Sequence, residues 1–166
     1  MVAFDGSILY VGTYSGLLKS NDGGSTLNKT PITNSPYSLV RIDTVLFVSS
    51  YGSSYALADG DTEWTSFPYD NSHVAISAYS QVAIDTSLYM ATDGGVFKFS
   101  WNDSTWTNKS KGLINKRVVS LIANGSALYA GTNGSGVFVS RNGGNTWTES
   151  DEGIDRVSHV FNGCNR

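Results

Sequence analysis

The chain repeats one short pattern four times, and no other feature of the sequence restricts its fold more. Each copy places a leucine in a β-type run, in ILYVGT, VLFVSS, SLYMAT and ALYAGT: Leu9, Leu46, Leu88 and Leu128. The intervals between them are 37, 42 and 40 residues. A second landmark keeps nearly the same spacing: Leu27, Trp64, Trp106 and Trp147. A strand-rich repeat of this length is typical of the blades of a β-propeller.

The last repeat illustrates the order of elements that we expect in each unit. Apolar or alternating runs at 118–123, 128–132 and 137–140 are separated by NGS and NGSG, and RNGGN leads into the polar run TWTES. Short β-type runs between Gly, Asn and Ser clusters are hairpin signals, and no segment keeps a helical period. The sequence therefore predicts an all-β propeller of four-stranded antiparallel blades at about 1–30, 37–67, 79–108 and 117–150.

Composition excludes several classes of protein. With 166 residues and a net charge of −3, the chain forms one domain and lacks the basic surface that nucleic acid requires. Cys164 is the only cysteine, so no internal disulfide is possible. No apolar run is long enough to span a membrane, and the opening MVAFDGSILY has no signal-peptide pattern. His73 and His159 stand alone, so we expect no metal and no cofactor.

Two turns between third and fourth strands share a motif: SNDGGSTL at 20–27 and SRNGGNTW at 140–147. A short side chain such as that of Asp22 accepts hydrogen bonds from backbone N–H groups of its own turn, and Asn142 can do so without charge. Glycines supply positive φ there. We expect Thr26 and Thr146 to begin the outer strands. The structural residues assigned to this motif are Ser20, Asp22, Gly24, Thr26, Ser140, Asn142, Gly144, Thr146 and Trp147.

These turns resemble the Asp-box of bacterial neuraminidase repeats, S-x-D-x-G-x-T-W. The same box occurs in sialidases, xyloglucan-active glycoside hydrolases, sortilin-type receptors and photosystem II assembly factor-like propellers. Leu27 replaces the usual Trp in the first box, and Asn142 replaces the usual Asp in the last. The turns at 58–64 and 100–106 are one residue shorter and lack the Gly pair. The resemblance implies a propeller, favours an exported protein, and assigns the box a structural role.

The resemblance to sialidases and xyloglucan-type enzymes raises the hypothesis of a glycoside hydrolase, or a fragment of one. Sialidases use a triad of arginines in a central pocket. Arg141 lies in a box turn and Arg166 is the last residue, so we do not expect either to reach such a pocket. The only Arg-Ile pair, Arg41-Ile42, lacks the proline of the sialidase signature. Asp93 is the only acidic residue in the turns after the second strands, whereas these hydrolases need two carboxylates. The sequence favours a non-catalytic module, with no catalytic residues assigned.

A binding function is the leading hypothesis. The turns between second and third strands share one face of a propeller, and one residue per blade follows each second strand: Tyr14, Tyr51, Asp93 and Asn133. Aromatic, carboxylate and amide groups together suit a neutral glycan or a polar peptide. The alternatives are that the tyrosines only cover the central channel, or that the protein is an assembly scaffold without a small ligand.

The ends of the repeat pattern predict how the ring closes. The first blade keeps only VAF of its inner strand, and RVSHVFNG at 156–163 resembles an extra inner strand. We expect this strand to pair through Val157, Val160 and Phe161 with the first blade of the same chain or of a partner. Self-association into a homo-oligomer is favoured, and the chain could also be part of a larger ring.

Overall fold

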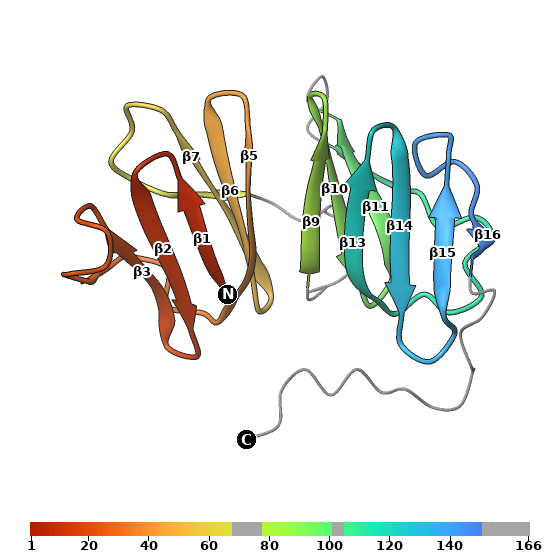
Figure 1. Ribbon diagram of the computed structural model, residues 1–166, viewed down its shortest axis with the longest axis horizontal. Coiled ribbons are helices and arrows are strands. Elements are labelled where there is room, and N and C mark those ends of the chain that lie inside the picture. The colour runs from red at the N-terminus through yellow and green to blue at the C-terminus, as the bar shows by residue number, and fades with distance from the viewer. Residues whose placement is uncertain (68–77, 101–104, 151–166) are drawn as a thin grey trace.

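The computed structural model describes residues 1–67, 78–100 and 105–150 (Figure 1). These residues contain sixteen β-strands and no helix. The strands form four separate antiparallel sheets of four strands each, and within each sheet neighbouring strands are consecutive in the chain. The prediction of an all-β propeller with four four-stranded blades is confirmed.

We call the sheets blades 1 to 4. Blade 1 contains β1 (Val2–Asp5), β2 (Ile8–Thr13), β3 (Gly16–Ser20) and β4 (Asn28–Lys29). Blade 2 contains β5 (Pro36–Ile42), β6 (Val45–Ser50), β7 (Ser53–Ala58) and β8 (Thr65–Phe67). Blade 3 contains β9 (Ala78–Ile84), β10 (Ser87–Thr92), β11 (Gly95–Ser100) and β12 (Thr105–Asn108). Blade 4 contains β13 (Val118–Asn124), β14 (Ala127–Thr132), β15 (Val137–Ser140) and β16 (Thr148–Glu149).

The inner strand of blade 1 is shorter than the inner strands of the other three blades. Strand β1 has 4 residues, whereas β5, β9 and β13 have 7 each. The segment 156–163, with Val157, Val160 and Phe161, lies outside the described residues, so its pairing stays a prediction.

The expectation that Thr26 and Thr146 begin the outer strands is wrong. Strands β4 and β16 start two residues later, because the side chains at 22 and 142 hold both threonines inside the turn.

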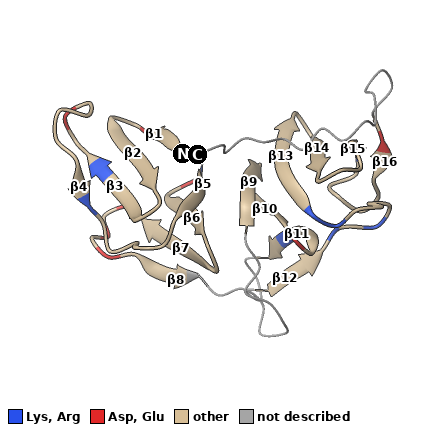
Figure 2. Cartoon of the chain, turned by 90° about the horizontal axis from the view of Figure 1, so that it is seen from below, with Lys and Arg blue, Asp and Glu red and all other residues tan. Residues whose placement is uncertain are grey.

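The blades form an arc around a common centre. Figure 2 shows the inner strands β1, β5, β9 and β13 toward the middle and the outer strands β4, β8, β12 and β16 toward the outside. Blades 1 and 4 lie at the two ends of the arc, on the same side of it, with blades 2 and 3 between them. The described residues therefore form an open fan and not a closed ring.

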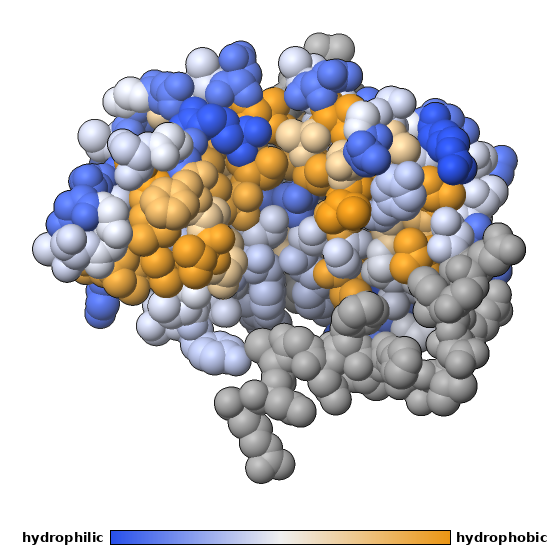
Figure 3. Space-filling model, viewed as in Figure 1, coloured by the Kyte–Doolittle hydropathy of each residue, from blue (hydrophilic) through white to orange (hydrophobic). Residues whose placement is uncertain are grey.

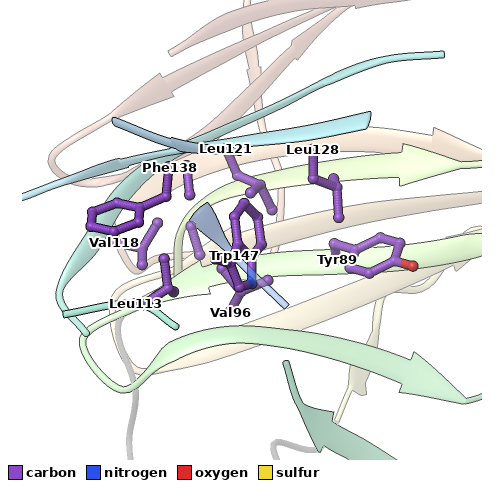
Figure 4. Close-up of a cluster of buried hydrophobic side chains, with 10 residues drawn as sticks. Tyr89, Val96, Leu113, Val118, Leu121, Leu128, Phe138 and Trp147 are labelled. Carbon is purple, nitrogen blue, oxygen red and sulfur yellow. The ribbon is translucent and has the colours of Figure 1, made fainter. Parts of the chain in front are cut away.

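Side chains packed between consecutive blades form the core, which divides into three clusters, one at each junction. The cluster between blades 3 and 4 contains Tyr89 and Val96 from blade 3 and Leu121, Phe138 and Trp147 from the segment of blade 4 (Figure 4). Comparable clusters join blade 1 to blade 2 and blade 2 to blade 3. Each blade is thus stabilised by apolar area buried against its neighbours.

Candidate functional site

The four residues predicted at the ligand face all lie directly after a second strand. Tyr14 follows β2, Tyr51 follows β6, Asp93 follows β10 and Asn133 follows β14. Figure 1 shows the β2–β3 and β14–β15 turns at the lower end of the fold, the end seen in Figure 2. Tyr14 is 88% exposed and Tyr51 is 66% exposed. We call the four second-to-third-strand turns, with the chain just before each inner strand, the rim.

One hydroxyl group in each blade closes the rim turn. The hydroxyl of Thr13 donates to the carbonyl of Gly16, that of Thr92 to the carbonyl of Gly95, and that of Thr132 to the carbonyl of Gly136, each at 2.9 Å. Ser50 makes the equivalent bond to the carbonyl of Ser53 at 3.2 Å. The final Thr or Ser of each second strand in the sequence pattern thus fixes the turn that carries each rim residue.

Asp93 contacts side chains from two other segments of the chain. Its Oδ1 accepts a hydrogen bond from the hydroxyl of Tyr79 at 2.9 Å and lies 3.2 Å from Nε of Arg117. Asp93 belongs to the β10–β11 turn, Tyr79 to the inner strand β9, and Arg117 immediately precedes β13. A carboxylate, a phenol and a guanidinium from blade 3 and the start of blade 4 therefore meet at one place.

Aromatic contacts extend this cluster to a third blade. The guanidinium carbon of Arg117 lies 5.7 Å from the ring centroid of Tyr79, within cation–π range. The Tyr79 ring also contacts the ring of Tyr37 on β5, with centroids 5.8 Å apart and tilted by 58°. We call Tyr37, Tyr79, Asp93 and Arg117 the rim cluster.

The environment of Tyr79 keeps its hydroxyl protonated. Partial burial and the hydrogen bond to Asp93 raise the pKa of the Tyr79 phenol, and the nearby Arg117 partly opposes this shift. The pKa of Arg117 is raised by its contact with Tyr79 and by the charge of Asp93. At neutral pH the cluster thus contains a neutral phenol, a cation and a carboxylate next to aromatic faces.

The sequence pattern predicted Asp93 but not the other members of the rim cluster, Tyr37, Tyr79 and Arg117. A signal for the tyrosines was present: SPYS at 35–38 and SAYS at 77–80 place each tyrosine at the same point of consecutive repeats. Arg117 precedes β13 where Ser35 precedes β5, and the carbonyls of Arg117 and Ser35 accept from the amides of Asn133 and Tyr51. No local sequence pattern indicates that the guanidinium of Arg117 turns toward blade 3.

The turn at Asp22 uses its carboxylate entirely for its own structure. Oδ1 accepts from the Ser20 hydroxyl at 2.7 Å and from the Thr26 amide at 2.9 Å, and Oδ2 accepts from the Thr26 hydroxyl at 2.7 Å. The bonds from the Thr26 amide and the Ser20 hydroxyl are the main causes that lower the Asp22 pKa to about 2. A carboxyl group held ionised in this way is a poor general acid.

The matching turn in blade 4 keeps this geometry without the charge. Oδ1 of Asn142 accepts from the Ser140 hydroxyl at 3.0 Å and from the Thr146 amide at 2.9 Å. The amide nitrogen of Asn142 donates to the Thr146 hydroxyl at 2.8 Å, so this hydroxyl accepts here and donates in blade 1. The backbone at Gly143 and Gly144 has φ of 65° and 79°, and at Gly23 and Gly24 of 70° and 99°.

Arg41 and Arg117 are both engaged in ion pairs, but in different places. Arg41 binds Asp5 of blade 1 and Asp59, which follows β7 of blade 2, so it links two blades. Arg117 pairs with Asp93 at the rim. Within the part of the chain that the structure describes, no group of three metal-ligating side chains occurs.

A polar cleft of about 400 Å³ opens at the other end of blade 3, with Ser87, Lys98, Thr107 and Lys109 among its lining residues. Lys109 donates to Oδ1 of Asn145 at 2.8 Å, and the ammonium of Lys98 lies 5.6 Å from the Tyr89 ring centroid. Both cations at this cleft are thus in contact with groups of blade 3 or of the segment of blade 4.

Four-stranded antiparallel blades arranged around a centre are the architecture of a β-propeller. The model of the DUF6242 beta propeller domain matches residues 38–161. Because this match covers most of the chain, the chain belongs to that family. No curated protein matches the chain in sequence. Over the residues described, no helix is long and apolar enough to cross a membrane.

Several solved structures share the fold. The extracellular domain of BT4673 from B. thetaiotaomicron is 19% identical, with a TM-score of 0.72 over 89% of this chain and 21% of that chain. The GH74 enzyme of Niastella koreensis is 26% identical, with a TM-score of 0.67 over 86% of this chain and 27% of that chain. YCF48 bound to D1 peptide is 15% identical, with a TM-score of 0.63 over 90% of this chain and 52% of that chain. The chain thus spans between a fifth and about half of these structures.

Proposed function

We propose that this propeller is a non-catalytic binding module that takes a neutral glycan at its rim. One observation carries the proposal: the tilted rings of Tyr37 and Tyr79 contact each other, and Tyr79 and Arg117 both lie against the carboxylate of Asp93. Sugars present apolar C–H faces that pack on aromatic rings, and hydroxyl groups that bond to carboxylate and guanidinium. The cluster offers both kinds of contact within one small area. Tyr14 and Tyr51, both exposed, extend the same rim.

The charges at the rim favour a neutral ligand. Asp93 and Arg117 neutralise each other, so the cluster has little net charge with which to attract an ion. A polar peptide is the second ligand class that this chemistry accommodates. YCF48 bound to D1 peptide has the same fold at 15% identity, which supports the architecture but no particular ligand.

An enzymatic function is the main alternative, and the 26% identity to the Niastella koreensis GH74 enzyme is the observation that favours it. Glycoside hydrolases of this kind need two carboxylates on either side of the scissile bond. At the four rim turns of the described chain Asp93 is the one carboxylate among the residues that follow the second strands, and it is paired with Arg117. These residues support binding without turnover.

Two finer assignments accompany the proposal. The hydrogen bonds of Asp22 and Asn142 support the interpretation of both turns as Asp-boxes of the neuraminidase-repeat type. The similarity to an extracellular domain from B. thetaiotaomicron supports an exported protein. Fractionation of cells that produce the native gene product tests the second assignment, and recovery of the protein only in the cytoplasm would contradict it.

The binding test compares the parent chain with two variants of the rim cluster. Tyr79→Ala removes the stacking ring and Arg117→Ala removes the cation, and Lys29→Ala on β4 removes an exposed cation outside the rim as the matched control. A panel of neutral oligosaccharides and a panel of polar peptides are titrated calorimetrically. We expect weak oligosaccharide binding that falls at least about tenfold, or 1.4 kcal/mol, in both rim variants and is unchanged in the control.

The same samples separate binding from catalysis. Mass spectrometry of the oligosaccharides after prolonged incubation should show unchanged chain lengths, and cleavage that Asp93→Asn abolishes would support the enzyme instead. Binding of peptides alone would replace the glycan by a peptide ligand. If the parent binds neither class, or if both rim variants keep full affinity, the proposed site is wrong.

A further inference from the structure

The three blade junctions of this chain are built in the same way. In each second strand a leucine is followed by an aromatic residue, and because side chains alternate along a strand, the two point to opposite faces of the blade. Tyr10 of blade 1 shares a buried cluster with Leu46 of blade 2. Phe47 of blade 2 does so with Leu88 of blade 3. Each junction thus joins the aromatic face of one blade to the leucine face of the next.

The third junction repeats the arrangement, with Tyr89 of blade 3 against Leu128 of blade 4. All six of these residues are at most 3% exposed. Three copies of one contact show that the two faces are complementary in shape and chemistry. The same two faces remain, one at each end of the arc, without a neighbouring blade in the described residues.

The leucine face of blade 1 is open and apolar. Leu9, which corresponds to the buried Leu46, Leu88 and Leu128, is only partly buried. Its neighbour Phe4, paired with it across β1 and β2, is 66% exposed, and Val2 on the same face is 69% exposed. Leu27, at the position of Trp147, is 46% exposed. Figure 3 shows apolar side chains gathered over β1 to β3 on the side toward the reader.

The aromatic face of blade 4 is open as well. Tyr129 corresponds to the buried Tyr10, Phe47 and Tyr89 but is itself only partly buried. Ile122, paired with Tyr129 across β13 and β14, is 59% exposed. Its counterparts Val40 and Val82 pack against the clusters of the second and third junctions. Blade 4 thus carries an aromatic face of the kind that the leucine face of blade 1 accepts.

We propose that these two faces are the halves of a fourth blade junction, which a second copy of this chain completes. Blades 1 and 4 lie at the two ends and on the same side of the arc (Figure 2). A second copy related by a two-fold axis therefore places its blade 4 on blade 1, and its blade 1 on blade 4. Two identical junctions then form in one dimer. The contact joins two different faces, but because both junctions are satisfied within the dimer, the assembly is a closed ring and not an open filament. The product is one ring of eight blades.

The geometry gives a distinctive test, because each copy contributes a different face to each junction. Phe4→Asp places a charge on the leucine face and Ile122→Lys places one on the aromatic face. Both side chains are exposed in the single chain, so neither change should disturb its folding. Ile114→Lys, at a residue 74% exposed in the connection between β12 and β13, is the matched control.

Light scattering coupled to size exclusion, and sedimentation velocity, give the mass of the chain over a range of concentrations. We expect the parent and the control at twice 17.8 kDa. Phe4→Asp and Ile122→Lys alone should each raise the dimer dissociation constant at least about tenfold, as loss of an interface contact does. Far-UV circular dichroism and thermal unfolding check that both variants keep the β fold. If either misfolds, Val2→Ser and Ile122→Ser replace the charged pair.

Mixing the two variants distinguishes this arrangement from a dimer in which each face contacts the same face of the other copy. In the mixed pair one junction joins two unaltered faces, and the other joins the carboxylate introduced into one copy to the ammonium introduced into its partner. We expect the mixture to dimerise more tightly than either variant alone. A monomeric parent at all concentrations, growth beyond two copies, unaffected variants, or a mixture as weak as its components would each overturn the proposal.

Discussion

The indole Nε1 of Trp147 donates a hydrogen bond of 2.6 Å to the backbone carbonyl of Lys109, 38 residues earlier in the chain. Lys109 follows the last strand of blade 3, and Trp147 precedes the last strand of blade 4. The backbone amide of Trp147 also donates to the carbonyl of Lys111 at 2.9 Å. One residue thus ties the outer part of blade 4 to the connection that leaves blade 3, while its ring fills the junction.

Trp147→Ala should lower the free energy of unfolding by about 3–5 kcal/mol, because it removes a large buried side chain from the junction. Trp147→Phe keeps much of the ring but leaves the Lys109 carbonyl without this donor, at a cost of roughly 1–3 kcal/mol. Urea unfolding followed by circular dichroism measures both. Equal costs for the two variants would show that the ring contributes little.

Acid should weaken the turn of blade 1 through Asp22. The folded-state pKa is lowered to about 2 from 3.8, so the carboxylate stabilises the fold above pH 3.8 and this stabilisation is lost as the pH falls through about 2. Asp22→Asn should reduce the loss of thermal midpoint between pH 4 and pH 2 relative to the parent. Asn142→Asp should increase it, because it introduces a carboxylate into the matching turn. Identical pH profiles in all three proteins would contradict this role.

Two turns between first and second strands contain an aspartate in the left-handed region. Asp43 and Asp85 each have φ of 50°, and at the equivalent position of blades 1 and 4 stand Gly6 and Gly125, with φ of 58° and 57°. Left-handed backbone is unfavourable for residues with a Cβ atom. Asp43→Gly and Asp85→Gly should each stabilise the fold by roughly 0.5 kcal/mol, after allowance for the greater freedom of glycine when unfolded.

The reverse substitution supplies the control for these turns. A Cβ atom added at Gly125 meets nothing within 4 Å, so Gly125→Asp tests backbone conformation without a steric clash. We expect a small loss of thermal midpoint in that variant and a small gain in the two glycine variants. A loss in all of them would show that the aspartates make contacts that outweigh the backbone effect.

Gly95→Ala should destabilise by clash as well as by strain. Gly95 is buried with φ of 119°, and an added Cβ would lie 2.0 Å from Oγ of Ser110. That hydroxyl accepts from the amide of Val96 at 3.0 Å, so it cannot move without loss of a buried hydrogen bond. We expect a cost of roughly 2 kcal/mol or more. Gly134→Ala, with φ of 92° but open space, should cost less in the same thermal unfolding assay.

The repeat in the sequence predicted the fold well because its information is local. Each unit of some 40 residues specifies its own hairpins through turn residues and alternating apolar positions. The hydrogen bonds at Asp22 and Asn142 join residues at most four positions apart, so a motif can report them. The start of the outer strands was predicted wrongly. The amides of Thr26 and Thr146 donate to the side chains at positions 22 and 142, so they are not available for hydrogen bonds to the neighbouring strand.

The candidate site was predicted only in part. Each residue that follows a second strand is set by the strand–turn pattern, which is why Asp93 was found. Tyr79 and Arg117 are 38 residues apart and meet only because blade 3 and the start of blade 4 lie side by side. Their contact depends on how far one blade is rotated relative to the next, and no single repeat encodes that angle.

By itself, the sequence determined four β blades, their turns, and the alternation of a leucine and an aromatic residue in each second strand. Only the tertiary structure decided which of these equivalent side chains are buried. Leu46 and Leu88 are covered by the preceding blade, whereas Leu9, with the same local sequence pattern, is not. Burial is a property of the neighbouring surface and not of the strand, so identical patterns form a core at three junctions and open faces at the two ends of the arc.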